Sequence, residues 1–427
     1  MYGNWKRIAA CLLVSAFGLI LFAGCMWETK SRLTDEAVEQ ENIGSGVEDG
    51  SPKEVVLWYY WETESHQRAL EQVIKDYNNS QDGIRVSTKY VPFADFKKQL
   101  SIGASADELP DLAIIDSPDH LSYAAMGIFA ELTDKVDVSG YREDVVGSCM
   151  LDGALYGVPF GVNCLGLFYN REMLEKAGCK APATWEELKE TASSLTKGNI
   201  TGFAFSALQG EEGTFNFLPW LWSASSGPEG MELQAWERAL SFVQELVESG
   251  VMSRECMNWT QGDVMYQFIS GNVAMMVNGS WQIPTIEREA PDFPWEAILI
   301  PCDKQYASVI GGENFAIIRG GNEEGALQFL EYVTAEPQLG RLLKAFGYFY
   351  PDQEKASIQY AQQEAMGGFL EALEYAKVRG PLVSWPDVSD EVSSAFNQVI
   401  TGEKEPKEAA KEARQAIEGI LRGEGEP

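Results

Sequence analysis

Apolar positions along the chain follow two spacings, and the pattern predicts short buried strands that alternate with amphipathic helices. Residues 55–60 form a continuous apolar run of β-forming residues, which is typical of a strand buried on both faces. Leu70, Val73 and Tyr77 then recur at helical spacing, and residues 84–91 predict the next strand. A strand, a helix and a strand in close succession form a βαβ unit, so we expect a parallel sheet with a right-handed crossover.

The same alternation continues to the end of the chain. Residues 96–104 and 121–126 predict helices around a buried strand at 112–115, which gives a doubly wound α/β lobe. Thr184 begins another helix, with Glu187 at the capping-box position. Further segments follow the same two spacings: helices at 233–247, 326–333 and 339–346, and a strand at 273–277. The last apolar stripe, over 407–421, predicts a terminal helix docked on a second lobe.

One stretch fits neither spacing. Residues 155–170, LYGVPFGVNCLGLFYN, contain no charged residue, although 23% of the chain is charged. Glycines and a proline interrupt the stretch, yet it ends on the strand-like Leu167-Phe168-Tyr169. A core strand would have fewer breakers and a surface loop fewer apolar residues, so we expect a buried segment that must also bend.

Length and charge narrow the possible functions. A chain of 427 residues exceeds the size at which one core stops growing, which favours two lobes. With 45% hydrophobic residues it can build sizeable cores. The formal net charge of -31 would repel phosphate groups, so we expect no nucleic-acid partner. Most of the excess carboxylates are interpreted as solvating an exported protein.

The N-terminus predicts export. Lys6 and Arg7 precede an uncharged run over 8–27, which has the form of a signal peptide or of a single retained membrane helix. Residues 21–25, LFAGC, resemble the bacterial lipobox, where cleavage precedes a cysteine that becomes diacylated, although Phe22 departs from the usual leucine. We therefore predict a signal peptide over 1–24 and lipidation of Cys25, whose paired acyl chains would anchor the protein stably. Residues 25–53 would form a flexible acidic tether.

Several kinds of chemistry lack their motifs. The five remaining cysteines have no CxxC spacing, which argues against a zinc site or a disulfide framework and favours free thiols, although one bridge stays open. The sequence has two histidines, His66 and His120, which do not form an HExxH zinc motif and make a Ser-His-Asp triad improbable. No GxSxG, P-loop or dinucleotide fingerprint occurs, so we expect no cofactor and no metal. A glycoside hydrolase stays open, because a catalytic carboxylate pair is a spatial property.

Aromatic residues gather beside breakers and strand ends, where open α/β sheets bind ligands. Flat aromatic faces stack on sugar rings, while carboxylates and amides bond the hydroxyl groups. For any one of these aromatic residues, a place in the core is about as good an interpretation as a ligand contact. They are Trp61 after the first strand, Phe215, Trp220 and Trp222 in a Gly/Pro-flanked segment, Trp281 after Asn278-Gly279-Ser280, Tyr350 before Pro351, and Trp385 between two prolines.

From about residue 55 onward the chain resembles the extracellular solute-binding proteins of ABC sugar importers, the maltose-binding-like family. The matching pieces keep their order: LPDLAIID, AAMGIFAELTD, LYGVPFGVNCLGLFYNREMLEKAG, PATWEEL, FISGNVAMMVNGSW, VIGGENFAI and FLEYVTAEP. The resemblance implies a type II periplasmic-binding-protein fold: two doubly wound α/β lobes, a multi-strand hinge and a ligand cleft between them. The first lobe would comprise 54–162 with 312–346, and the second 163–311 with 347–427.

The resemblance also explains the uncharged stretch as the first hinge crossing, with returns near 309–314 and 346–351. An unpaired charge covered by both lobes would be costly there, and glycines absorb the change on closure. The positions that the resemblance implies for ligand contacts are Trp61, Glu62, Asp116, Ser117, Asn163, Trp281, Gly312 and Asn314, with a looser match at Phe215, Trp220 and Trp222.

The resemblance therefore implies a non-enzymatic, monomeric, lipid-anchored receptor on the extracytoplasmic face of the cell membrane. It would capture a carbohydrate, with an oligosaccharide preferred, and deliver it to the transmembrane subunits of an ABC permease. Two alternatives stay open. A cell-bound glycoside hydrolase would need a carboxylate pair across the cleft. A receptor for a non-sugar solute such as glycerol phosphate or a peptide would need cations there, and the sequence places none near Trp61, Asp116 or Trp281.

Overall fold

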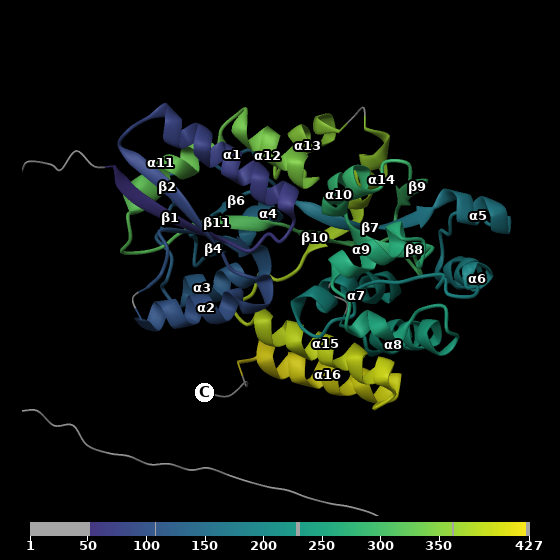
Figure 1. The fold of residues 1–427 in the computed structure, drawn as a ribbon. Helices are drawn as coiled ribbons and strands as arrows, with labels where there is room; N and C mark the ends of the chain where they lie inside the picture. Colours follow the sequence, from purple (N-terminus) through teal and green to yellow (C-terminus); the bar gives the residue numbers. More distant parts are fainter. Residues whose placement is uncertain (1–51, 107, 228–230, 361–362, 424–427) are drawn as a thin grey trace, which may run out of the picture. The chain divides into compact units, whose positions relative to one another are not determined.

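Two open sheets organise the chain in the computed structural model, which describes residues 52–106, 108–227, 231–360 and 363–423 (Figure 1). The predicted signal peptide, Cys25 and nearly all of the predicted tether lie outside the described residues. The first sheet has the order β2 (Ile84–Tyr90), β1 (Lys53–Tyr59), β3 (Leu112–Asp116), β11 (Glu313–Ile317) and β6 (Val158–Pro159). The second has the order β12 (Ala376–Val378), β10 (Ser308–Gly311), β7 (Asn163–Asn170) and β8 (Met275–Gly279), with β9 (Trp295–Ile298) also paired to β7.

The first sheet and its helices form what we call the first lobe. Strand β1 pairs in parallel with β2 and β3, as the βαβ pattern predicts. Strand β11 pairs antiparallel with β3 and β6, because it enters the sheet after a crossing from the other lobe. Figure 1 shows α1, α11 and α12 along one side of this sheet and α2 and α3 along the other. The helices are α1 (Glu64–Ser80), α2 (Phe93–Ala106), η1 (Ser117–Asp119), α3 (His120–Ala125), α11 (Glu323–Thr334) and α12 (Gln338–Phe346).

The second sheet and its helices form the second lobe, whose sheet is mixed. Strand β7 runs antiparallel to β8, β9 and β10, whereas β10 and β12 are parallel. Helices cover this sheet from two separate cores. They are α5 (Arg171–Ala177), α6 (Trp185–Leu195), α7 (Glu211–Ala224), α8 (Leu233–Glu248), η2 (Arg254–Met257), α9 (Gln261–Ile269), η3 (Ser280–Gln282), α10 (Ile283–Glu289), α14 (Glu364–Tyr375), α15 (Trp385–Thr401) and α16 (Pro406–Leu421).

Strand β7 explains the uncharged stretch. All eight of its residues are buried, and they alternate between the two cores of the second lobe. Leu165 and Leu167 face the core shared with α7, α8 and α15, whereas Cys164 and Phe168 face the core shared with α9 and α14. Each buried leucine contributes about 1.5–3 kcal/mol relative to an exposed one, and a charge at any of these positions would lose its solvation.

The chain crosses between the lobes at three places that touch one another. The backbone N–H of Val162 donates to Phe349 O and that of Phe349 donates to Val162 O, at 2.9 and 2.8 Å. A Cβ on Gly312, whose φ is +139°, would lie 2.2 Å from the carbonyl oxygen of Gly161. Glycine is thus required at this contact for both its conformation and its size. Two short helices, α4 (Glu143–Gly147) and α13 (Gln353–Gln359), and the hairpin of β4 (Met150–Leu151) and β5 (Ala154–Leu155) complete the structure.

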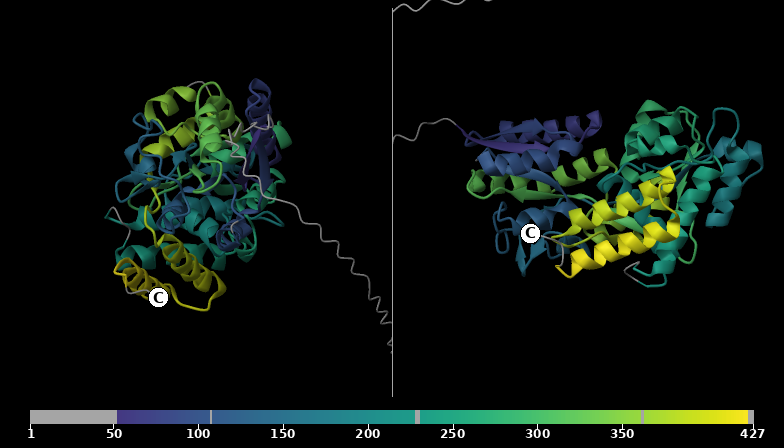
Figure 2. Two further views of the ribbon diagram at one scale, coloured as in Figure 1. Left: turned by 90° about the vertical axis from the view of Figure 1, so that its left-hand side faces the viewer. Right: turned by 90° about the horizontal axis from the view of Figure 1, so that it is seen from below.

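The terminal helix predicted over 407–421 is confirmed. Ala409, Ala410, Ala413 and Ile417 of α16 are buried in the core of the second lobe. Figures 1 and 2 both show α16 lying beside α15. The preceding helix, α15, packs against α7 and α8 and also contacts η1 of the first lobe, which places its N-terminus at the boundary between the lobes. The lobe boundaries proposed from the sequence stay a prediction.

Candidate functional site

The carboxyl ends of β1 and β3 lie at the same edge of the first sheet because the two strands are parallel. Trp61 follows β1 and is buried, with its indole 4.5 Å from the ring of Phe346 and 5.4 Å from that of Phe160, centroid to centroid. Its Nε1–H donates to Oε1 of Glu313 at 3.0 Å. Asp116 ends β3 and pairs directly with Glu313 in the sheet register. One edge of the first lobe therefore presents an indole and two carboxyl groups.

Arg379 brings the second lobe to this edge. It follows β12, and its Nη2 donates to both carboxylate oxygens of Asp116 at 2.8 and 2.9 Å. Its Nε lies 2.5 Å from Oε1 of Glu211, at the start of α7. The guanidinium also lies 4.2 Å from the ring centroid of Phe215, a cation–π distance. One buried cation thus joins a carboxylate from each lobe.

Glu211 is held from several directions. The indole Nε1–H of Trp385, at the start of α15, donates to its Oε2 at 2.8 Å. Burial raises the pKa of Glu211, Arg379 lowers it in part, and Asp116 raises it again. For Arg379, burial alone would lower the pKa, but the charges of Asp116 and Glu211 outweigh burial and raise it. Arg379 is therefore a fully charged guanidinium between two acidic groups.

Glu313 and Asn163 have hydrogen-bonding capacity left over. Glu313 accepts from Trp61 and, at 2.9 Å, from the hydroxyl of Tyr348, while burial raises its pKa to about 7 against the pull of the Trp61 hydrogen bond. Tyr60 also lowers the pKa of Glu313 through a side-chain hydrogen bond, while the Oδ1 of Asn163 is buried and has no partner among the described residues. Asn163 begins β7 and pairs with Gly311 of β10. The Oδ1 of Asn163 is an acceptor, and the carboxyl group of Glu313 accepts when ionised and can donate when protonated, so the site can exchange hydrogen bonds with hydroxyl groups.

Trp281 supplies an aromatic face from the second lobe. It lies in η3 directly after β8, is half-buried, and packs against the cores of both lobes. Its ring centroid is 6.0 Å from that of Phe215. The turn folds the indole over Gly279, where a Cβ would lie 1.8 Å from the ring. The turn therefore fixes the direction of the indole.

Ser117, Gly312 and Asn314 meet at a small pocket beside the crossings, which Ser148 and Gly161 also line. The Ser117 N–H donates to the Gly312 carbonyl at 3.0 Å, and Asn314 Nδ2 donates to Ser148 at 3.1 Å. The family resemblance implied ligand contacts at the first three residues, and in the structure they lie where the chain crosses between the lobes.

We call the connected set of side chains that spans both lobes the interlobe site. It consists of Trp61, Asp116, Asn163, Glu211, Phe215, Trp281, Glu313, Arg379 and Trp385. Six of these nine residues were expected from the sequence. Glu62, which was also expected, is exposed and follows Trp61 directly. Burial is the main cause that raises the pKa of Glu212 in α7, and the charge of Glu62 raises it further.

Besides Glu62 and the three residues at the small pocket, three more expected residues lie outside the interlobe site: Trp220, Trp222 and Tyr350. Residues 211–224 form helix α7, not a loop, and this helix carries Trp220 into the core against Trp185 and Phe242, with no exposed surface. Trp222 is buried in the same core. Tyr350 bonds Glu336 through its hydroxyl group, beside α12.

Three residues of the interlobe site were missed from the sequence: Glu211, Glu313 and Arg379. Glu313 lies within the quoted motif VIGGENFAI, which was the only available signal. The expectation of no cation near Asp116 was wrong, because Arg379 reaches it from 263 residues away in the chain. Lys97 of α2 likewise pairs with Asp119 at 2.8 Å.

The two histidines lie in the first lobe and are buried. Burial lowers the pKa of each to about 3, so His66, stacked on Phe346, and His120 are neutral near pH 7. Cys149, Cys164, Cys179, Cys256 and Cys302 are free thiols, and burial raises the pKa of Cys256 to about 12. In the described ranges no cluster of His, Cys, Asp and Glu could hold a metal ion. Within the same ranges no helix is both long and apolar enough to cross a membrane.

Comparison with known proteins gives a consistent picture. Residues 72–366 match the family model described as bacterial extracellular solute-binding protein. A protein of Brucella abortus (strain 2308), named simply as a binding protein, is 23% identical over 396 residues, covering 89% of this chain and 95% of that protein. The lactose-binding protein of Rhizobium radiobacter is 26% identical over 307 residues, covering 66% and 71%. An ABC transporter solute-binding protein from Thermotoga lettingae TMO, solved with α-D-tagatose, shares the fold with a TM-score of 0.77 at 24% identity, covering 86% of this chain and 100% of that one.

Proposed function

Because this chain belongs to the bacterial extracellular solute-binding protein family, we propose that it captures a carbohydrate, with an oligosaccharide preferred, and delivers it to an ABC permease. One observation carries the choice of ligand class: the interlobe site combines indole rings and carboxylates from both lobes. The half-buried indole of Trp281 can lie against the C–H face of a sugar ring, and the polar groups of the site can bond the hydroxyl groups at the ring edge. The lactose-binding relative supports the same ligand class.

Each lobe contributes its own aromatic and polar side chains to the interlobe site. The first lobe supplies Trp61, Asp116 and Glu313, and the second supplies Asn163 and Trp281. A ligand that contacts both lobes stabilises the state in which the lobes are together, and recognition of that state by the permease would couple capture to delivery. We place the lobe boundaries at 54–162 with 312–346 and at 163–311 with 347–427, with the crossings as the hinge.

The charge at the interlobe site argues against an anionic solute. Its cation, Arg379, is already paired with both Asp116 and Glu211. A phosphate or carboxylate ligand would have to displace one of these partners and would lie beside the other carboxyl groups, which repel it. A neutral, hydroxyl-rich ligand avoids this cost.

For the N-terminus, we propose cleavage before Cys25 and diacylation of that cysteine. Residues 25–53 would then tether the binding unit to the extracytoplasmic face of the membrane. The motif LFAGC and the preceding uncharged run support this proposal. Two acyl chains give a stable anchor, whereas one chain binds only reversibly. We also propose that the protein acts as a monomer.

The test of function starts from a thermal-shift screen of the full chain against neutral oligosaccharides, with glycerol phosphate and short peptides as comparison ligands. A ligand at one hundred times its Kd should add about 2.7 kcal/mol to the free energy of unfolding. Measuring released reducing ends over the same panel separates binding from hydrolysis. Stabilisation only by an anionic solute or a peptide, or steady turnover of a glycan, would reject a sugar receptor.

The site is then tested with Trp281→Ala, which should weaken glycan binding by about thirtyfold or more, because truncation of a central indole costs about 2 kcal/mol or more. Trp295→Ala is the matched control, since Trp295 of β9 is also a half-buried indole of the second lobe but packs on Phe168. Calorimetry gives the affinity and the melting temperature without glycan gives the stability. Loss of melting temperature with wild-type affinity in Trp281→Ala would assign this indole to the core instead.

A further inference from the structure

Arg379 has an unusual set of partners for a buried cation. Only 4% of its side chain is exposed, and it contacts Asp116 of the first lobe together with Glu211 and Phe215 of the second. Its Nη1 also donates to the carbonyl of Ile310, one residue before the Gly311-Gly312 crossing, at 3.4 Å. Separation of the lobes would divide these partners, leaving Asp116 on one side and Glu211 on the other.

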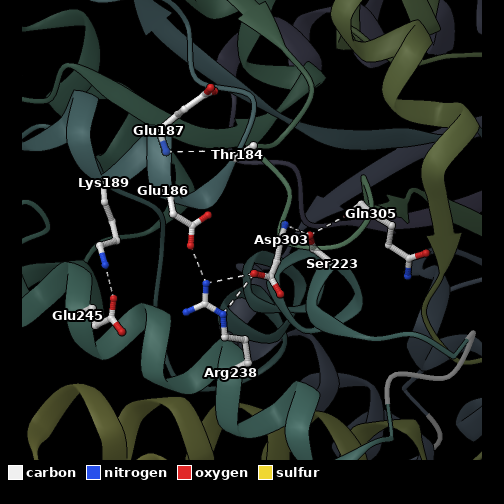
Figure 3. A network of polar contacts seen from close by, with 9 residues as sticks. All are labelled: Thr184, Glu186, Glu187, Lys189, Ser223, Arg238, Glu245, Asp303 and Gln305. Carbon is white, nitrogen blue, oxygen red and sulfur yellow. Dashed lines mark hydrogen bonds and ion pairs between the residues drawn. The ribbon is translucent and has the colours of Figure 1, made fainter.

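Arg238 offers a comparison within the same chain (Figure 3). It also bonds two carboxylates, Glu186 at 2.9 Å and Asp303 at 3.1 Å, and lies 5.0 Å from the ring centroid of Trp185. All of these partners belong to the second lobe, so no movement between the lobes would part them. The two arginines thus share the same kinds of partner. They differ in burial, with 34% of the Arg238 side chain exposed against 4% of Arg379, and in whether their contacts cross between the lobes.

Resting on the proposed function, we propose that Arg379 is a positioning residue of the interlobe site, which joins Asp116 and Glu211 across the two lobes and so couples ligand binding to closure. A planar guanidinium can serve both carboxylates at once and fix their orientation, which a lysine ammonium does less well. The remaining lone pairs of the two carboxylates are then directed by one common partner. The ligand therefore meets an ordered pair of acceptors only when the lobes are together.

The energetics distinguish this role from a purely structural one. A buried ion pair contributes little net stability relative to a well-packed apolar group, because desolvation offsets the attraction. Removal of Arg379 alone is different, since it leaves Asp116 and Glu211 facing each other without a counter-charge. The bridge between the lobes is then lost, because Glu211, whose pKa is raised by burial and by Asp116, gains no replacement cation to hold it to the first lobe. The effect should appear in closure and affinity beyond what a loss of stability explains.

The test compares Arg379→Gln, Arg379→Lys and Asp116→Asn with Arg238→Gln in the full chain. Small-angle scattering without added glycan measures the radius of gyration, and stopped-flow measures the dissociation rate of the glycan found with the wild type. Arg379→Gln should enlarge the radius of gyration and weaken binding at least about thirtyfold, mainly through faster dissociation. Arg379→Lys should recover part of the affinity. Arg238→Gln should keep wild-type dimensions and an affinity within about twofold, even if its melting temperature falls.

Asp116→Asn keeps the proposal testable if Arg379→Gln fails to fold. It removes the charge and one of the two acceptors that hold Arg379 to the first lobe but leaves Arg379 paired with Glu211, so it should also enlarge the radius of gyration. If the wild type binds no glycan in the screen, the proposed function fails, yet the scattering comparison still decides the role of Arg379. Wild-type dimensions in both Arg379→Gln and Asp116→Asn, or equal losses of affinity in Arg379→Gln and Arg238→Gln, would overturn the proposal.

Discussion

At the scale of single residues, Glu313 shows how burial alters one carboxyl group of the interlobe site. Its pKa is raised to about 7, first because burial disfavours the charged form. An acid whose pKa is higher in the folded than in the unfolded state contributes stability that is present at low pH and lost as pH rises through the folded value. The contribution of Glu313 should therefore be complete below pH 4.5 and gone above about pH 7.

Glu313→Gln tests this directly, because glutamine resembles the protonated acid and cannot ionise. Between pH 4.5 and 7.5 the wild type should lose on the order of 3 kcal/mol of unfolding free energy relative to the variant, from about 1.4 kcal/mol per pKa unit. Urea unfolding at both pH values gives this difference. His66, His120, Asp119 and other shifted groups cancel in the comparison.

Glu190→Gln, on the exposed face of α6, is the control and should show no such pH-dependent difference from the wild type. Parallel pH profiles of the wild type and Glu313→Gln would mean that Glu313 is charged in the folded protein near neutral pH. The interlobe site would then hold one more negative charge than we infer.

At the scale of elements, the contact between the first two crossings depends on Gly312. Its φ of +139° is unfavourable for other residues, and a Cβ there would overlap the carbonyl of Gly161. Gly312→Ala should lower the free energy of unfolding by about 3 kcal/mol or more, as the sum of conformational strain and a clash with backbone that cannot move away. Denaturant unfolding checks the value.

Gly153→Ala separates the two causes. Gly153, in the turn of the β4–β5 hairpin, has a φ of +83°, but a Cβ there would meet nothing within 4 Å. This substitution should cost only about 1–2 kcal/mol, from conformation alone. If Gly312→Ala is no worse than Gly153→Ala, the crossings do not constrain each other, and their close contact has no energetic consequence.

Elements could be predicted from the sequence where one element's own side chains decide its structure. The apolar spacings of α8, α12 and α16 predicted these helices to within a few residues, because each buries one continuous stripe. For α1 the spacing predicted the helix but not its start at Glu64. Side-chain hydrogen bonds at the ends of helices were predicted less accurately, because they depend on the exact positions of neighbouring residues. Thr184 accepts from Glu187 N at 3.2 Å, but the Glu187 carboxylate bonds the N–H of Ala183, so the predicted capping box is incomplete (Figure 3).

The interlobe site was predicted only in part, for the same reason. Trp61, Asp116 and Trp281 follow predicted strands, and the family resemblance implied ligand contacts at all three positions. Arg379 and Glu211 could not be found this way, because an ordinary charged residue gains its role only when distant segments meet. Trp220 shows the opposite case. Its place among breakers left a ligand contact open, but α7 continues across Pro219 and buries it in the core.

At the scale of the whole molecule, the formal net charge of -31 bears on which solutes approach the protein, whereas the N-terminal segment bears on its attachment to the membrane. The charge keeps the binding unit soluble and repels anionic solutes over several ångströms, within the range that salt screening allows. The N-terminal segment is the part that we propose anchors the unit to the membrane. Since the interlobe site consists of residues between 61 and 385, binding and anchoring should be separable.

Cys25→Ser should separate them. Without its acceptor thiol the chain cannot be diacylated, so the variant should leave the membrane fraction or keep residues 1–24 uncleaved, while the wild type stays with the membrane through two acyl chains. Glycan affinity should not change, because no residue of the interlobe site is touched. Fractionation without detergent and mapping of the N-terminus measure both outcomes, with Cys302→Ser, a thiol of the second lobe, as the matched control that should remain anchored. A wild-type protein that is membrane-bound yet retains residues 1–24 would show that the apolar run itself is the anchor, and Cys25→Ser would then stay in the membrane as well.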